Sequence, residues 1–92
     1  MDRKAAQTFL ASEYGERMKQ VEEFIEEKDK AGGVVFIQGL MAELYERSRK
    51  ESAPPGVGDA LRELRMCENY LHDRSASVKM LLEHVAIMTP KM

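Results

Sequence analysis

The sequence predicts an all-α fold in the form of a compact bundle of about five short helices, and three observations support this prediction. Apolar residues recur at steps of three and four through most of the chain, as they do along one face of a helix. Glycine and proline are concentrated at a few positions, chiefly residues 15, 32–33 and 52–58. The stretch 34–37 has high β-propensity, but no similar stretch elsewhere offers it a partner strand.

Length and charge restrict the class of protein further. The chain has 92 residues, enough for a single domain spanning residues 1–92. Its 14 basic and 16 acidic side chains give a net charge of −2, the wrong sign for binding nucleic acid through overall charge. A single cysteine excludes an internal disulfide, no apolar run is long enough to span a bilayer, and no secretory leader is evident. We therefore expect a cytoplasmic protein.

The first third of the chain predicts two helices. One covers about residues 2–13, and the second runs from a break near Gly15 to Lys30. Gly32 and Gly33 are expected to end the second helix, because glycine readily adopts the left-handed backbone found at helix C-termini. The predicted core residues of these two helices are Ala5, Ala6, Phe9, Leu10, Met18, Val21, Phe24 and Ile25.

A connector at residues 52–58 separates the third predicted helix, about 34–51, from the fourth, 59–74. Its two prolines cannot continue a helix, because proline lacks the amide donor. Asp59 is the expected N-cap of the fourth helix. The predicted core residues are Phe36, Ile37, Leu40, Met41, Leu44 and Tyr45 in the third helix, and Ala60, Leu61, Leu64, Cys67 and Leu71 in the fourth.

The last predicted helix, about 78–88, has more apolar surface than one core face requires. On a helical wheel its predicted core face consists of Val78, Leu81, Val85 and Met88. Met80 and Ile87 lie roughly 100–120° away from that face, with His84 between them and the core. Two interpretations remain open. Either the other four helices wrap this helix completely, or Met80, His84 and Ile87 face another subunit.

Motifs for catalysis or metal binding are not evident in the sequence. There is no glycine-rich phosphate-binding loop followed by Lys and Ser or Thr, and no His-Glu-x-x-His pair. Cys67 lies on the apolar face of its predicted helix, where burial makes a thiol unreactive. Glu68 and His72 share a helical face, but no further ligands are suggested. We expect no catalytic residue, no cofactor and no metal site.

Two segments near the C-terminus carry a pattern found in a known family. Residues 61–71 read Leu-Arg-Glu-Leu-Arg-Met-Cys-Glu-Asn-Tyr-Leu, and residues 79–88, after a polar break, read Lys-Met-Leu-Leu-Glu-His-Val-Ala-Ile-Met. This resembles the closing helices of the collar domain in bacterial clamp-loader proteins, the delta-prime and gamma/tau subunits of DNA polymerase III. The order of apolar segments upstream, from Phe9-Leu10 to Leu44-Tyr45, is also similar. Ser75 and Ser77 depart from the family, which often has Asn there.

The resemblance implies a non-catalytic oligomerisation domain, with delta-prime preferred because the chain stops soon after Pro90. Collar domains pack side by side and hold together the complex that loads the sliding clamp onto primed DNA, within the DNA polymerase III holoenzyme, a nucleotidyltransferase. The implied partners are the collar domains of other clamp-loader subunits, with no small-molecule substrate, no direct contact with nucleic acid and no membrane. The expected interface residues are Tyr70, Met80, His84 and Ile87.

An alternative function belongs to a different class. The chain would then be a free-standing helical adaptor or regulator, whose methionine-rich groove receives an amphipathic helix of a partner. Seven methionines and no tryptophan agree with an adaptable apolar surface of this kind.

Overall fold

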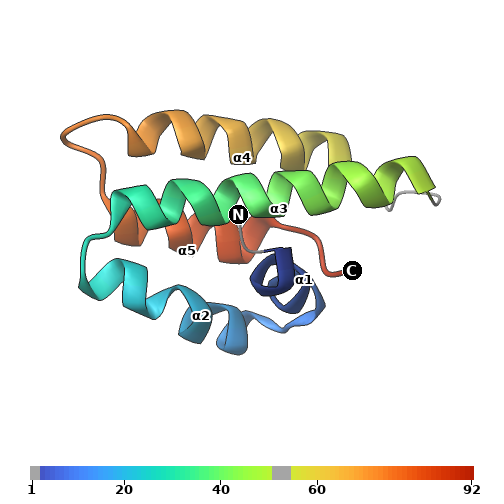
Figure 1. The fold of residues 1–92 in the computed structure, drawn as a ribbon, viewed down its shortest axis with the longest axis horizontal. Helices are drawn as coiled ribbons and strands as arrows, with labels where there is room; N and C mark the ends of the chain where they lie inside the picture. The colour runs from blue at the N-terminus through green and yellow to red at the C-terminus, as the bar shows by residue number, and fades with distance from the viewer. Residues whose placement is uncertain (1–2, 51–54) are drawn as a thin grey trace.

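The computed structural model describes residues 3–50 and 55–92, and over these residues it is an all-α bundle, as predicted (Figure 1). The five helices are α1 (Arg3–Ala11), α2 (Tyr14–Glu26), α3 (Lys30–Lys50), α4 (Val57–Leu71) and α5 (Val78–Met88). The predicted boundaries of the last helix are correct. None of the described helices is both long enough and apolar enough to cross a membrane.

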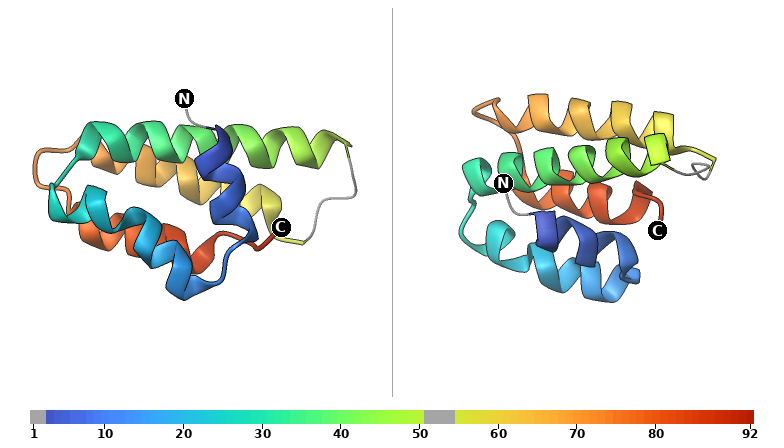
Figure 2. Two further views of the ribbon diagram at one scale, coloured as in Figure 1. Left: turned by 60° about the horizontal axis from the view of Figure 1, so that its bottom comes forward. Right: turned by 45° about the vertical axis from the view of Figure 1, so that its right-hand side comes forward.

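The helices surround one apolar core. The long helix α3 packs along α4 and is crossed by α1, while α2 pairs with α5 on the other side of the core (Figures 1 and 2). The largest fully buried side chains come from all five helices, and they are Phe9, Leu10, Val21, Ile37, Leu40, Leu44, Leu64, Leu71, Leu82 and Val85. Phe9 and Phe36 meet edge to face, with ring centroids 5.1 Å apart. Burial of this set is the main stabilising contribution.

The prediction that Gly32 and Gly33 end the second helix was wrong. α2 already ends at Glu26, and the left-handed residue after it is Lys28, with φ of 51°. α3 then starts at Lys30, because the Asp29 carboxylate accepts a hydrogen bond from the Gly32 amide at 2.8 Å and so caps the new helix. The glycines serve close packing instead: a Cβ at Gly33 would lie 3.3 Å from a methyl group of Leu71.

Other predicted boundaries were too long or began too late. α1 ends at Ala11 rather than residue 13, and α4 ends at Leu71 rather than residue 74; residue 2, the predicted start of the first helix, lies outside the described residues. α4 begins at Val57, with Gly56 in the left-handed conformation at its N-cap, so Asp59 lies in the first turn and is not the cap. The connector predicted at 52–58 therefore ends at Gly56, and residues 52–54 of it lie outside the described residues.

Most predicted core residues are buried, with one clear exception. Tyr45 of α3 is 58% exposed, because it sits at the edge of the helix beyond the buried Leu44. On α5 the buried face is Val78, Leu82, Val85 and Ala86, whereas the predicted Leu81 and Met88 are only half-buried at its border. The predicted face was thus rotated slightly about the α5 axis. Cys67 is buried, and burial raises the pKa of its thiol, as expected for an unreactive core residue.

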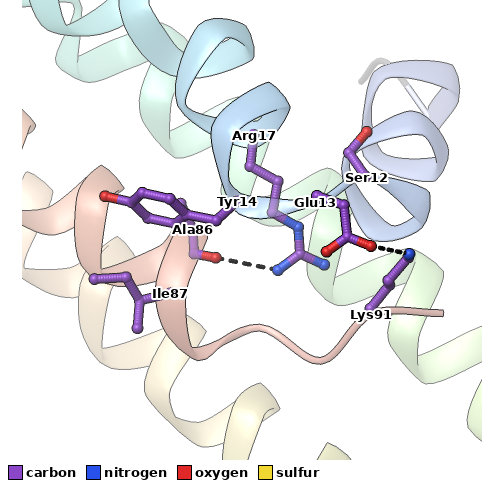
Figure 3. A pocket seen from close by; sticks show the side chains of 7 residues that line it. All are labelled: Ser12, Glu13, Tyr14, Arg17, Ala86, Ile87 and Lys91. Atoms are coloured by element: carbon purple, nitrogen blue, oxygen red, sulfur yellow. Dashed lines mark hydrogen bonds and ion pairs between the residues drawn. The ribbon is translucent and has the colours of Figure 1, made fainter.

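A buried arginine joins the ends of three helices. Arg17 of α2 is only 4% exposed, and its guanidinium lies 4.7 Å from the centroid of the Phe9 ring. It donates to five backbone carbonyl oxygens at 2.6–3.3 Å, those of Phe9, Leu10, Ala86, Thr89 and Pro90. Figure 3 shows the guanidinium reaching toward the end of α5. Burial lowers the pKa of Arg17, opposed by the nearby charge of Glu13. Carbonyl oxygens at the C-termini of α1 and α5, which have no amide partner within their own helices, thus accept hydrogen bonds from Arg17.

A second polar cluster fixes α1 against α3. The buried Glu43 carboxylate accepts from Arg3 at 2.9 Å and from Gln7 at 3.1 Å, and it also pairs with Arg47 at 3.3 Å. Burial acts to raise the pKa of Glu43, but these hydrogen bonds and positive charges lower it below its ordinary value. Hydrogen bonds from Lys50 and Arg3 lower the pKa of the neighbouring Glu46 to about 2.

We predict that Arg17→Met destabilises the fold by about 3 kcal/mol or more, because it leaves several buried carbonyl oxygens without donors. Urea denaturation followed by circular dichroism measures this difference. Lys19→Met is the matched control on the exposed side of the same helix and should change stability by no more than about 0.5 kcal/mol. An Arg17→Met variant as stable as the control would contradict the assigned role.

We also predict that acid weakens the contact between α1 and α3. The pKa values of Glu43 and Glu46 are lower in the folded protein than in the unfolded chain. The stabilisation of the fold that these two carboxylates provide is therefore complete when the pH is above their pKa values in the unfolded chain. It is lost as the pH falls through the lowered pKa values of the folded protein, and the pKa of Glu46 there is about 2. Urea denaturation from pH 7 to pH 2 should show that Glu46→Gln is less stable than the wild type at pH 7 and approaches it near pH 2. A stability difference independent of pH would refute this.

Candidate functional site

The outward side of α5 carries an exposed apolar stripe. Met80 is 71% exposed and Ile87 is 69% exposed, the two largest values among the large apolar residues of the described chain. With the exposed His84 they follow the spacing i, i+4, i+7, which places all three along one side of a helix. The opposite side, with Val78, Leu82 and Val85, is buried in the core. α5 is therefore apolar on two sides and covered on one.

The arrangement of the neighbouring helices explains this exposure. α5 lies between α2 and α4, and α3 covers part of its inner side (Figures 1 and 2). Packing against α2, α3 and α4 uses the inner side and the flanks of α5, and no described element crosses its outer side. The interpretation in which the other four helices wrap the last helix was therefore wrong. The sequence-predicted residues Met80, His84 and Ile87 are brought together on one open face.

Each end of this stripe borders a shallow hollow that contains a tyrosine. Tyr70 of α4 is 53% exposed and lines a hollow of about 310 Å³ with Met80 and with residues of the loop between α4 and α5. Tyr14 of α2 lines a hollow of about 460 Å³ with Ile87, and Figure 3 shows its ring alongside Ile87. The outer face of α5 thus extends onto both flanking helices. We call Tyr14, Tyr70, Met80, His84 and Ile87 the α5 face.

Polar contacts hold the α5 face at its middle and at its C-terminal end. His84 Nε2, between Met80 and Ile87, lies 3.2 Å from a carboxylate oxygen of Glu63 on α4, and both side chains are about half exposed. Near Ile87, Lys91 pairs with Glu13, while Arg17 donates to the carbonyl oxygens of Ala86 and Thr89 (Figure 3). The hydrogen bond from Lys91 lowers the pKa of Glu13. The backbone that carries Ile87 is therefore anchored to α1 and α2.

Tyr14 and Arg17 are the residues of this region that the sequence did not reveal. Tyr14 precedes Gly15 at the predicted break, and its position beside α5 depends on the pairing of α2 with α5. Arg17 lies one turn before Val21 and therefore on the buried side of α2. This position is the only feature of the sequence that indicates a buried role for Arg17. An arginine at such a position usually extends its charged end into water, so the signal is weak.

The described residues contain no cluster of side chains suited to a metal ion. No group of three or more His, Cys, Asp and Glu side chains lies close enough together there to hold a metal ion. Glu68, considered with His72 as a pair of ligands, instead accepts a hydrogen bond from Gln38 at 2.7 Å. The α5 face combines exposed apolar and aromatic side chains with the polar pair of His84 and Glu63.

Comparison with known proteins adds no relative. No protein-family model matches the chain, and neither a curated protein nor a solved structure is significantly similar to it. The fold and the α5 face define the class of protein: a small helical bundle with one apolar helix face left uncovered.

We predict that the double variant Met80→Asp/Ile87→Asp folds with a stability within about 1 kcal/mol of the wild type, because both side chains project into solvent. Circular dichroism should show unchanged helix content, and thermal denaturation measures the stability. Leu82→Asp, on the buried side of the same helix, is the contrasting variant and should be largely unfolded. Unfolding of the double variant would show that the α5 face belongs to the core of the folded chain.

Proposed function

We propose that this chain is a non-catalytic assembly module that packs against a neighbouring subunit through the α5 face. The observation that carries the proposal is the exposure of Met80 and Ile87 on the outer side of α5, a helix whose inner side is packed into the core. Exposed apolar residues gathered on one helix face, with a polar border, are typical of a surface that a partner covers.

The geometry suggests which residues supply most of the binding energy. Met80 and Ile87 project directly away from the core, so a partner that covers them removes nearly all of their apolar surface from water. Tyr70 and Tyr14 stand beside them and offer large rings whose conformational entropy is low. His84 and Glu63 form the polar border. A few such anchors, rather than total area, determine the specificity of a contact.

We further propose that the assembly is the bacterial clamp loader and that this chain is a collar domain, of the delta-prime type in preference to gamma/tau. The support is the resemblance of residues 61–71 and 79–88 to the closing collar helices, because these residues form α4 and α5 and supply most of the α5 face. The module acts in the cytoplasm and helps to hold together the complex that loads the sliding clamp. Its partners are the collar domains of other clamp-loader subunits.

The proposal predicts that Met80→Asp/Ile87→Asp in the full chain abolishes assembly, because two carboxylates would be buried in an apolar contact. The chain is co-expressed with the clamp-loader subunits encoded in its own genome. Affinity purification followed by size-exclusion chromatography then measures their recovery. We expect the wild type to elute with those subunits and the variant to lose them by about 100-fold or more, the equivalent of about 3 kcal/mol.

A matched variant separates loss of the contact from loss of solubility. Val35→Asp makes the same kind of change at an exposed apolar residue of α3 that lies outside the α5 face, and it should assemble normally. Assembly of the α5-face variant at the wild-type level would rule out this face. Recovery of the wild type with an unrelated protein in place of clamp-loader subunits would exclude the collar and favour the adaptor.

A further inference from the structure

A second surface of the bundle combines an apolar cleft with arginine side chains. The cleft, of about 490 Å³, lies between α3 and α4, which run side by side (Figures 1 and 2). It is lined by Met41, Ala42, Tyr45, Leu61, Arg62 and Arg65. None of these residues belongs to the α5 face, and Glu63 of α4, which contacts His84 of α5, does not line the cleft. The cleft is therefore separate from the α5 face.

The positive charge around this cleft is only partly neutralised. Arg62 pairs with Asp59 at 3.1 Å, and both side chains are largely exposed. Arg49 and Arg65 are exposed too, and neither forms an ion pair with any residue in the described parts of the chain, 3–50 and 55–92. The Arg49 guanidinium lies 5.8 Å from the centroid of the Tyr45 ring. A chain with net charge −2 thus has two unpaired cations beside one apolar cleft.

We propose that this cleft binds an acidic peptide segment of a partner protein. An apolar side chain of the segment enters the cleft between Tyr45 and Leu61, and carboxylates on either side of it pair with Arg49 and Arg65. Arginine suits this role because its planar guanidinium donates two parallel hydrogen bonds to one carboxylate. The apolar lining supplies affinity, and the two charges select acidic sequences and orient them.

The lining favours a peptide over a nucleic acid. Met41, Ala42 and Leu61 match an aliphatic or aromatic side chain, but they offer no hydrogen bonds to the edge of a base. The exposed ring of Tyr45 would be the stacking surface for a base, yet Arg49 already lies over it. The negative net charge of the chain further opposes a polyanion with many phosphates.

Selection from a library of random 12-residue peptides displayed on phage tests the proposal with the full chain as bait. We expect enriched peptides to carry Asp or Glu on both sides of a Leu, Ile, Phe or Tyr. The affinity of one enriched peptide, made synthetically with a fluorescent label, is then measured by anisotropy. Arg49→Glu/Arg65→Glu should weaken its binding by at least about tenfold, the effect of losing two exposed charge pairs.

A matched double charge reversal controls for net charge. Lys4→Glu/Lys19→Glu changes two exposed lysines on α1 and α2 and should bind within about twofold of the wild type once salt screens distant charges. Failure to enrich acidic peptides, or equal binding by Arg49→Glu/Arg65→Glu, would overturn the proposal. So would a labelled 12-residue oligothymidine that binds as tightly as the peptide at physiological salt. The Met80→Asp/Ile87→Asp variant should bind the peptide normally, which separates this proposal from the function of the α5 face.

Discussion

The structure depends on one constraint: five short helices enclose a core but cannot enclose one another. α5 packs its inner side against α2, α3 and α4, and no other helix within residues 3–50 and 55–92 covers its outer side. On α4 the exposed side is mostly polar, with Arg62, Arg65 and Asn69, and the apolar Met66 there is less exposed than Met80 and Ile87. On α5 the corresponding positions hold Met80 and Ile87. This difference between two neighbouring helices is the physical basis for assigning a contact surface to α5.

Arg17 makes that surface rigid. Its guanidinium, in place of water, donates hydrogen bonds to five carbonyl oxygens at the ends of α1 and α5. The backbone beside Ile87 is therefore held by a buried side chain and not by solvent. The backbone amide of Met92 donates to the carbonyl of Leu10 at 2.8 Å and ties the segment after α5 to the same corner. A surface held in this way loses little conformational entropy when a partner binds it. The corner therefore links the stability of the fold to the proposed function.

Periodicity in the sequence was sufficient to predict the helices and the second apolar side of α5, because both depend on spacing along one helix. Met80, His84 and Ile87 were identified in this way. The start of α3 was predicted wrongly. The chain turns at the left-handed Lys28 and the new helix is capped by Asp29, whereas the glycine pair suggested a later break. Composition alone does not show which of these two signals separates the helices. Arg17 and Tyr14 were missed for a different reason. Their roles come from contacts with residues about 70 positions away, which no local pattern contains.

The two surfaces assigned here differ in their physical character. The α5 face gathers exposed apolar and aromatic residues from α2, α4 and α5, and suits a folded neighbour. The cleft between α3 and α4 is small and bordered by charge, and suits an extended segment. α4 contributes Tyr70 to the α5 face and Leu61, Arg62 and Arg65 to the cleft, so the two proposed contacts share no residue.

Photocrosslinking within the assembled complex tests the central claim most directly. A benzoylphenylalanine in place of Met80 in the full chain, irradiated after co-expression with the clamp-loader subunits of the same genome, should form a covalent adduct with the collar domain of a neighbouring subunit. The same group in place of the exposed Lys19 should form none. Adducts that are absent at position 80, or equally frequent at both positions, would contradict the assignment of the α5 face as a subunit contact.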